Sequence, residues 1–271
     1  MSEQSLGRLI AQGRTAEIYA WTDGYVLKLF RDWCPPSWLD YEFRIARIVQ
    51  DAKLPVPAVS EIVEVKGRRG LVYERVDGPS MLRVIQTHPW QVRRLGRLMA
   101  DLHAAIHNLS VPDLPSYKVR LTRDITAAAA LPDDLKTAAL ARLSSLPDGT
   151  ALCHGDFHLD NIIMARGGPV IIDWMTAASG NPLADMARTR MIIYTGTPPN
   201  WGALQLWLLG RLRAQLQSAY LGRYAQLRPF DRQEFAAWQP VMAAARLNEK
   251  IAGEREWLLA EVRRGWVNRT A

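Results

Sequence analysis

The most informative part of the sequence is residues 153–174, which read CHGDFHLDNIIMARGGPVIIDW. Two apolar runs flank the segment 166–169, and this pattern predicts a β-hairpin. Such a hairpin holds Asn161 at one end and Asp173 at the other, close in space although 12 residues separate them. Asp156 lies on the loop that leads into the hairpin. We therefore expect two carboxylates and one amide to converge beside a cleft.

This set of side chains suits phosphoryl transfer. Mg²⁺ prefers hard oxygen ligands in octahedral geometry, which Asp173 and the amide oxygen of Asn161 can supply alongside the phosphates of ATP. A separate carboxylate, Asp156, must orient the acceptor hydroxyl and take its proton. The order and spacing, His-x-Asp, four residues, Asn and a later Asp, match the kinase pattern.

Residues 1–78 are predicted to form a small α+β lobe. A helix is expected over residues 38–50, and the Asp-Gly pair at residues 23–24 predicts a hairpin. The expected strands are residues 7–12, 16–21, 25–30, 61–65 and 71–76. The tip of the second hairpin, with Lys66, Arg68 and Arg69, is interpreted as a solvated turn and not as a nucleic-acid patch.

A lysine stands inside one of these apolar strands. An unpaired ammonium at Lys28 would be expensive there, and Glu42 on the following helix is its natural partner. Such a pair holds the lysine as a point charge for the α- and β-phosphates of ATP. Gly13, in a turn between two strands, could lie over the phosphates, but a single glycine is a weak signal.

Residues 79–271 are predicted to form a larger, mainly helical lobe. Its expected helices are residues 90–109, two shorter ones within 124–146, and then 183–195, 201–225, 231–246 and 248–265. The fold class is therefore α+β with two lobes, a small antiparallel β-sheet lobe with one helix and a helical C-terminal lobe. A junction between two lobes is a common place for a ligand cleft.

Composition sets broad limits. Of the 271 residues, 48% are hydrophobic and 23% are charged, which is ordinary for a globular protein and excludes disorder, collagen and coiled coil. The absence of a spanning apolar stretch or a signal peptide predicts a soluble cytoplasmic protein without a membrane partner. Two cysteines fit a reducing compartment. The net charge of +7 could mean nucleic acid, anionic membrane or phosphorylated ligands.

Five motifs together resemble the aminoglycoside phosphotransferase family, which groups small-molecule kinases with choline, homoserine and macrolide kinases on a protein-kinase-like fold. The resemblance covers about residues 7–190. The motifs are Gly13-Arg14-Thr15-Ala16-Glu17-Ile18-Tyr19, Leu27-Lys28-Leu29, His154-Gly155-Asp156 with Asn161, Ile171-Ile172-Asp173-Trp174, and Gly180-Asn181-Pro182-Leu183-Ala184-Asp185.

The resemblance implies roles for individual residues. Asp156 becomes the catalytic base, Asn161 and Asp173 the Mg²⁺ ligands, Lys28 the phosphate clamp and Glu42 its partner. The segment 73–76, including Glu74 and Val76, becomes the hinge whose backbone meets the adenine of ATP. Asp185 braces the catalytic loop. Independently of the resemblance, we interpret His154 as a residue that holds the same loop by hydrogen bonds. The implied partner is a small-molecule hydroxyl acceptor, with no nucleic acid and no membrane. Trp174 in place of a phenylalanine, and no activation loop ending in Ala-Pro-Glu, favour a small-molecule kinase over a protein kinase.

Two other functions stay open. The first is a nucleotide-binding pseudokinase with a regulatory role, although every chemical position is filled. The second is a zinc-dependent hydrolase that uses the run His154-x-Asp156-x-His158-x-Asp160, with His103 and His107 as a further pair on one helix. That function would leave Lys28 and Asp173 unexplained, and the two helical histidines are interpreted as packing or capping groups.

The charge is unevenly distributed along the chain. Residues 1–78 hold 11 basic and 11 acidic side chains, whereas residues 79–271 hold 23 and 16. A lobe that grips a polycationic aminoglycoside is expected to be rich in unpaired carboxylates. The balance therefore counts against an aminoglycoside acceptor and leaves neutral or anionic hydroxyl compounds open.

Overall fold

The computed structural model describes residues 6–195 and 202–267. It divides into two compact units, which are described separately. Unit 1 comprises residues 1–84 and 160–176, and unit 2 comprises residues 85–159 and 177–271. This division follows contacts within the chain. The predicted boundary after residue 78 marks instead the end of the nucleotide-binding lobe, and it stays a prediction.

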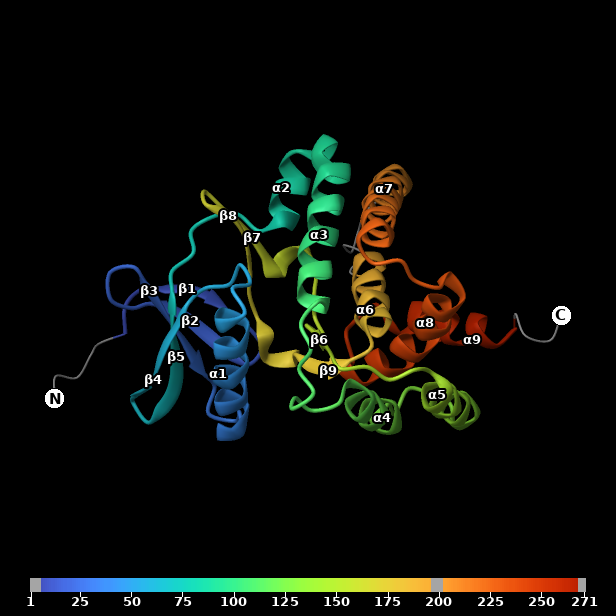
Figure 1. Cartoon of the computed structure of the whole chain (residues 1–271), viewed down its shortest axis with the longest axis horizontal. Helices are drawn as coiled ribbons and strands as arrows, with labels where there is room; N and C mark the ends of the chain where they lie inside the picture. Colours follow the sequence, from blue (N-terminus) through green and yellow to red (C-terminus); the bar gives the residue numbers. More distant parts are fainter. Residues whose placement is uncertain (1–5, 196–201, 268–271) are drawn as a thin grey trace. The chain divides into compact units, whose positions relative to one another are not determined.

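Unit 1 is built on a five-stranded antiparallel sheet (Figure 1). Helix α1 (Pro36–Asp51) packs on this sheet through Leu39, which contacts the buried Phe30 and Leu71. The strands, in the order β1-β2-β3-β5-β4, are β1 (Leu9–Gln12), β2 (Ala16–Ala20), β3 (Tyr25–Phe30), β5 (Arg68–Glu74) and β4 (Val59–Val65).

The segment that begins at residue 160 adds a second, two-stranded sheet to unit 1. Its strands β7 (Ile162–Ala165) and β8 (Gly168–Ile171) form the predicted hairpin, with Ile162 opposite Ile171. Short 3₁₀ helices flank it, η2 (Leu159–Asn161) before and η3 (Trp174–Thr176) after. The main chain of Met164 donates to Pro79 O at 2.8 Å, which ties the hairpin to the end of the first part of unit 1.

Unit 2 is mainly helical. Helices α3 and α7 run side by side (Figure 1), and their approach depends on Gly96, where a Cβ would lie 2.7 Å from the carbonyl oxygen of Leu216. A short sheet of β6 (Ala151–Cys153) and β9 (Ala178–Gly180) carries the loop that includes Asp156. The helices are η1 (Pro89–Gln91), α3 (Val92–His107), α4 (Tyr117–Ala127), α5 (Asp133–Ser145), α6 (Pro182–Tyr194), α7 (Ala203–Leu227), α8 (Arg232–Arg246), η4 (Leu247–Glu249) and α9 (Arg255–Val267).

The predicted α+β class, with a small antiparallel sheet and one helix in the N-terminal part and a mainly helical C-terminal part, is confirmed. Several element boundaries differ from prediction. Helix α4 begins at Tyr117, seven residues before the predicted start at residue 124, because Ser116 accepts a hydrogen bond from Val119 N at 3.4 Å and caps it. The helix predicted over 248–265 is interrupted at Lys250 and Gly253, which adopt φ angles of 54° and 81°. The short helix α2 (Met81–Thr87) was not predicted.

The second hairpin of the large sheet also differs from prediction. Its turn is only Lys66 and Gly67, with φ angles of 52° and 76°, and Val65 pairs with Arg68. Two-residue turns with positive φ match the twist of the flanking strands. Arg68 therefore belongs to strand β5, where it donates to Glu17 Oε2 at 2.9 Å instead of standing in solvent. Among the described helices, none combines the length and the apolar character that crossing a membrane requires.

Candidate active site

In unit 1, Lys28 is held between two carboxylates. It lies on β3, opposite Ile18 on β2 and Leu71 on β5. Its Nζ donates to Glu42 Oε1 at 2.7 Å and to Asp173 Oδ1 at 3.0 Å. The predicted Lys28–Glu42 pair therefore forms, and Asp173 completes it.

Burial shapes the charge of this group. The Glu42 side chain is only 2% exposed and that of Lys28 13%. Burial by itself lowers the pKa of Lys28, but the carboxylates of Glu42 and Asp173 outweigh this effect and hold the pKa above its ordinary value. The lysine is therefore a fixed cation. Sequence reasoning assigned Tyr73 to the hinge segment and missed that its hydroxyl donates to Glu42 Oε1 at 3.1 Å. Its position on the strand beside β3 was the only available signal.

The hairpin of β7 and β8 brings Asn161 and Asp173 to the same end. The carbonyl oxygen of Asn161 accepts a hydrogen bond from Ile172 N at 3.0 Å. Asp173 adopts a left-handed φ of 64°, which is unfavourable for a residue other than glycine and is often found at functional sites. Its side chain is 47% exposed. The amide of Asn161 and the carboxylate of Asp173 are hard oxygen donors of the kind that Mg²⁺ takes, so this end of the hairpin fits that ion.

The positions expected to meet the nucleotide lie at two turns of unit 1. Gly13 N donates to Ala16 O at 2.8 Å, and a Cβ at Gly13 would make only ordinary contact with that oxygen, at 3.4 Å, so packing does not demand glycine there. Glu74 ends β5, and its N–H donates to Ala58 O at 2.8 Å. The Val76 main chain finds no hydrogen-bond partner within residues 6–195 and 202–267.

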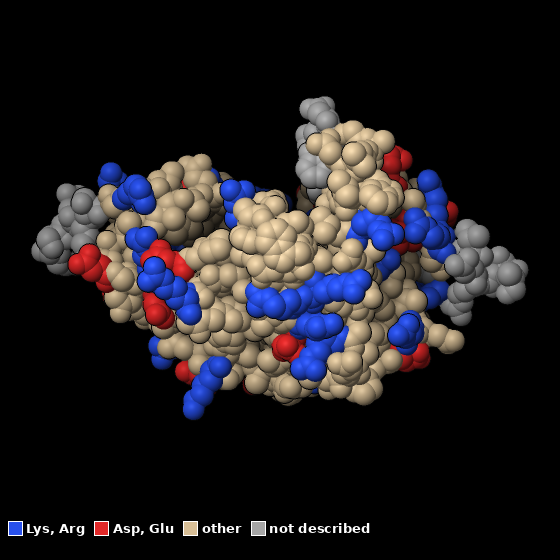
Figure 2. All heavy atoms as spheres, turned by 90° about the horizontal axis from the view of Figure 1, so that it is seen from above, with Lys and Arg blue, Asp and Glu red and all other residues tan. Residues whose placement is uncertain are grey.

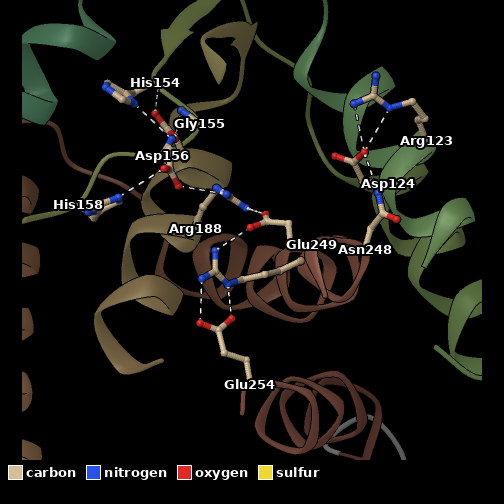
Figure 3. Close-up of polar contacts among 12 residues, drawn as sticks. Arg123, Asp124, His154, Gly155, Asp156, His158, Arg188, Asn248, Glu249 and Glu254 are labelled. Atoms are coloured by element: carbon tan, nitrogen blue, oxygen red, sulfur yellow. Dashed lines mark hydrogen bonds and ion pairs between the residues drawn. The ribbon is translucent and has the colours of Figure 1, made fainter. Parts of the chain in front are cut away.

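In unit 2, Asp156 lies on the loop after β6 and both of its oxygens have partners (Figure 3). Arg188 Nη2 donates to Oδ1 at 3.2 Å, and His158 Nε2 lies 3.4 Å from Oδ2. Burial raises the pKa of Asp156, but His158 and Arg188 outweigh burial and hold the pKa well below its usual range. Asp156 is therefore an ionised carboxylate.

Asp185, on α6, binds the main chain of the same loop. Its carboxylate accepts hydrogen bonds from His154 N at 2.6 Å and Gly155 N at 2.9 Å. His154, itself buried, accepts from Asp156 N through Nδ1 at 3.3 Å (Figure 3). The structure thus places His154 and Asp185 against the main chain of the loop.

Two histidines from α3 complete the environment of Asp185. Its Oδ2 lies 3.1 Å from His103 Nε2 and 3.4 Å from His107 Nε2. The Nδ1 atoms of these rings lie 2.7 Å from Tyr220 OH and 2.6 Å from Tyr224 OH, both on α7. All five side chains are buried. The prediction that both histidines are packing or capping groups missed these two tyrosines.

The histidine and aspartate pattern bears on the zinc hypothesis. Among the described residues, the only set of three whose ligand atoms lie within 4.8 Å of one another is His103, His107 and Asp185, so His154, Asp156 and His158 form no such set. The carboxylate of Asp185 already accepts four hydrogen bonds, three at Oδ2 and one at Oδ1. The polar atoms of these three side chains therefore have hydrogen-bond partners without a metal ion, and the cluster supports the loop.

Sequence reasoning also missed the arginine beside Asp156. Arg188 stands three residues after Asp185 on α6, and residues three apart share a helix face. That spacing was a usable signal, because a cation on the helix face that holds the loop of Asp156 lies close to that loop.

The model of the phosphotransferase enzyme family matches residues 7–238. None of the curated proteins matches the chain.

Several solved structures are similar in fold. Aminoglycoside-3'-phosphotransferase of type VIII is 18% identical, with a TM-score of 0.62 over 88% of this chain and 91% of that chain. A thermostable mutant of aminoglycoside phosphotransferase APH(4)-Ia is 16% identical, with a TM-score of 0.67 over 98% and 96%. A putative fructosamine-3-kinase from Haemophilus somnus 129PT is 13% identical, with a TM-score of 0.64 over 96% and 90%.

Proposed function

Since the chain belongs to the phosphotransferase enzyme family, we propose that it transfers the γ-phosphate of ATP to a hydroxyl group of a small molecule. The observation that carries this proposal is Lys28, a cation held by Glu42 at 2.7 Å and by Asp173 at 3.0 Å. A fixed cation beside an exposed carboxylate suits a nucleotide phosphate with its metal ion. Another structure of a thermostable APH(4)-Ia mutant, 16% identical to this chain with a TM-score of 0.65, is a ternary complex with AMP-PNP and hygromycin B.

The nucleotide would bind to unit 1. Lys28 would contact the α- and β-phosphates, and the turn at Gly13 would lie over them. The main chain of Val76, two residues after Glu74, would meet adenine. Asn161 and Asp173 would hold Mg²⁺. When bound, this ion neutralises phosphate charge and polarises the transferred group.

Asp156 would act on the acceptor. Its carboxylate accepts a hydrogen bond from the acceptor hydroxyl and so aims the oxygen at the γ-phosphorus. As the new O–P bond forms, the bond between the γ-phosphorus and the bridging oxygen breaks, ADP leaves with that oxygen, and the hydroxyl proton passes to the Asp156 carboxylate. His154 and Asp185 hold the loop so that this geometry exists before the substrate arrives.

The acceptor we propose is neutral or anionic, because the carboxylates near Asp156 are already paired. Glu249 accepts from Arg188 at 2.6 Å and from Arg246 at 3.2 Å. Glu254 accepts two bonds from Arg246, at 2.6 and 2.9 Å. A polycationic acceptor would have to displace these arginines from their carboxylates, which disfavours it.

Part of the positive surplus counted over residues 79–271 lies in a groove between two helices, and not beside Asp156. Basic side chains outnumber acidic ones on the face drawn in Figure 2. Helices α3 and α7 line a groove of about 530 Å³, and of its arginines only Arg223 has a carboxylate partner among the described residues, Asp101 at 2.7 Å. The arginines of the groove are Arg93, Arg97, Arg211 and Arg223. Whole-lobe charge is thus a weaker guide to the acceptor than the paired carboxylates beside Asp156.

The test is an acceptor screen that monitors ADP release from MgATP, with Asp156→Ala as the blank. We expect Asp156→Ala to abolish turnover and to keep nucleotide binding, whereas Asp173→Ala weakens MgATP binding. Near-normal turnover by Asp156→Ala would remove the assignment of the base. A protein that binds MgATP but phosphorylates nothing in a panel of neutral, anionic and cationic alcohols would support the pseudokinase alternative. Stoichiometric zinc without magnesium-dependent ATP binding would support the hydrolase.

A further inference from the structure

Arg188 reaches the Asp156 carboxylate from the helix that also carries the loop brace. It stands one helical turn after Asp185 on α6, and its Nη2 donates to Asp156 Oδ1 at 3.2 Å (Figure 3). Asp185 binds the main chain of the loop, whereas Arg188 binds the side chain that would act on the acceptor. One face of α6 therefore fixes both the backbone and the carboxylate of the loop.

The guanidinium of Arg188 is itself oriented from the opposite side. Its Nη1 donates to Glu249 Oε1 at 2.6 Å, and the other oxygen of Glu249 accepts from Arg246 Nη1 at 3.2 Å. Arg246 is in turn held by the buried Glu254. The result is a chain of alternating charges from Asp156 to Glu254. Its members lie on α6, on η4, on α8 and immediately before α9. A planar guanidinium held at both ends has little freedom to rotate.

The arrangement is not one that stability alone would favour. The Arg188 side chain is only 12% exposed, and its Nε is buried without a hydrogen-bond partner among the described residues. A buried donor without a partner costs stability. Local compromises of this kind are expected where function sets the geometry.

The two oxygens of Asp156 differ in what holds them. Oδ1 faces Arg188, which is charged at every pH at which proteins fold, and Oδ2 faces His158 at 3.4 Å. The hydrogen bond from Asp156 N to His154 orients the main chain but not the carboxylate. Arg188 is therefore a permanent cation in contact with this carboxylate.

We propose that Arg188 is a positioning residue for Asp156, and that Glu249 keeps Arg188 in place. This inference rests on the proposed function, in which Asp156 orients the acceptor hydroxyl. Arg188 fixes the direction of the Asp156 carboxylate, so that one oxygen points at the acceptor before it binds. The lowered pKa of Asp156, to which Arg188 contributes, agrees with this contact.

The first test compares Arg188→Met with Arg188→Lys and Arg190→Met. Arg190 lies on the same helix, is 22% exposed against 12% for Arg188, and contacts Glu261 and Tyr194, so it is a matched control. ADP release from MgATP is measured with the best acceptor of the screen, or with water where none is found. A misplacement of about 1 Å costs about 100-fold in rate, so we expect Arg188→Met to lower kcat by about that factor. The KM for MgATP stays unchanged, Arg188→Lys restores part of kcat, and Arg190→Met resembles the wild type.

A second measurement separates positioning from a structural role. Crystal structures of the wild type and of Arg188→Met show whether the Asp156 carboxylate turns. Equal kcat for Arg188→Met and Arg190→Met, or an unmoved carboxylate in Arg188→Met, overturns the inference. A wild type that releases no ADP would instead contradict the proposed function, and the crystal structures would still decide the role of Arg188.

Discussion

Unit 2 is expected to lose stability between pH 6.5 and pH 5, because it buries histidines in their neutral form. Burial is the largest cause that lowers the pKa of His103, to about 3, and it lowers the pKa of His107 in the same direction. An unfolded histidine has a pKa of about 6.5. Below that pH the unfolded chain therefore binds protons that the folded chain does not bind, and the equilibrium shifts toward unfolding.

The size of the effect follows from His103. A group whose pKa is depressed on folding contributes its full stability above the unfolded pKa and loses it as the pH falls. The loss is about 1.4 kcal/mol for each pH unit, so His103 alone accounts for about 2 kcal/mol between pH 6.5 and pH 5. His107 adds a further loss of the same sign. Carboxylates contribute little in this window, since their unfolded pKa values lie near 4. A domain is stable by only about 5–15 kcal/mol, so the loss is measurable.

The assay is urea unfolding followed by tryptophan fluorescence at several pH values from 7.5 to 5. His103→Gln removes the titrating group, and His88→Gln, at an exposed position beside Trp90, is the control. We expect the control to lose stability on acidification like the wild type. His103→Gln starts from a lower stability at pH 7.5, because it weakens the contacts with Tyr220 and Asp185, but loses about 2 kcal/mol less on going to pH 5. An identical pH dependence in His103→Gln and the wild type would refute the reasoning.

Three further predictions concern single contacts. Glu42→Gln removes one of the two carboxylates that hold Lys28 and should weaken MgATP binding about tenfold in calorimetry, equal to about 1.4 kcal/mol; unchanged affinity would show that Asp173 alone suffices. Gly180→Ala places a Cβ 2.6 Å from Tyr117 Cβ and should cost about 1–3 kcal/mol in urea unfolding, and no loss would mean that β9 can shift. Glu254→Gln leaves a buried guanidinium with reduced pairing and should cost about 3 kcal/mol, whereas a loss below about 1 kcal/mol would show that water replaces the carboxylate.

Much of the fold could be predicted because its signals are local. The Asp-Gly turn before Tyr25, the apolar strands beside it and the two-proline start of α1 each depend on neighbouring residues. The errors arose where a single cap or a single positive φ decided the boundary. Ser116 starts α4 early, and Lys250 ends η4 in a left-handed conformation, although neither residue interrupts the apolar pattern.

The site was predictable to the extent that its residues stand in one motif. Asp156, Asn161 and Asp173 were predicted from their spacing, and their roles stay a prediction. Tyr220 was missed because it contacts His103 across 117 residues of sequence. No periodicity within one helix reports such a contact. Arg188 was missed for another reason, since its position on the face of Asp185 was readable but an arginine on a helix is usually interpreted as solvated.

The paired carboxylate at Asp156 limits how it can act in the proposed reaction. A carboxylate held ionised well below its usual pKa is a weak base, and proton acceptors are most effective when their pKa lies near the working pH. In a loose transition state the acceptor oxygen keeps its proton until late, so orientation matters more than basicity. Arg188→Met separates the two effects, because it makes Asp156 more basic while freeing it to rotate. A fall in kcat means that orientation dominates, and a rise would mean that Arg188 restrains a base whose proton affinity limits the rate.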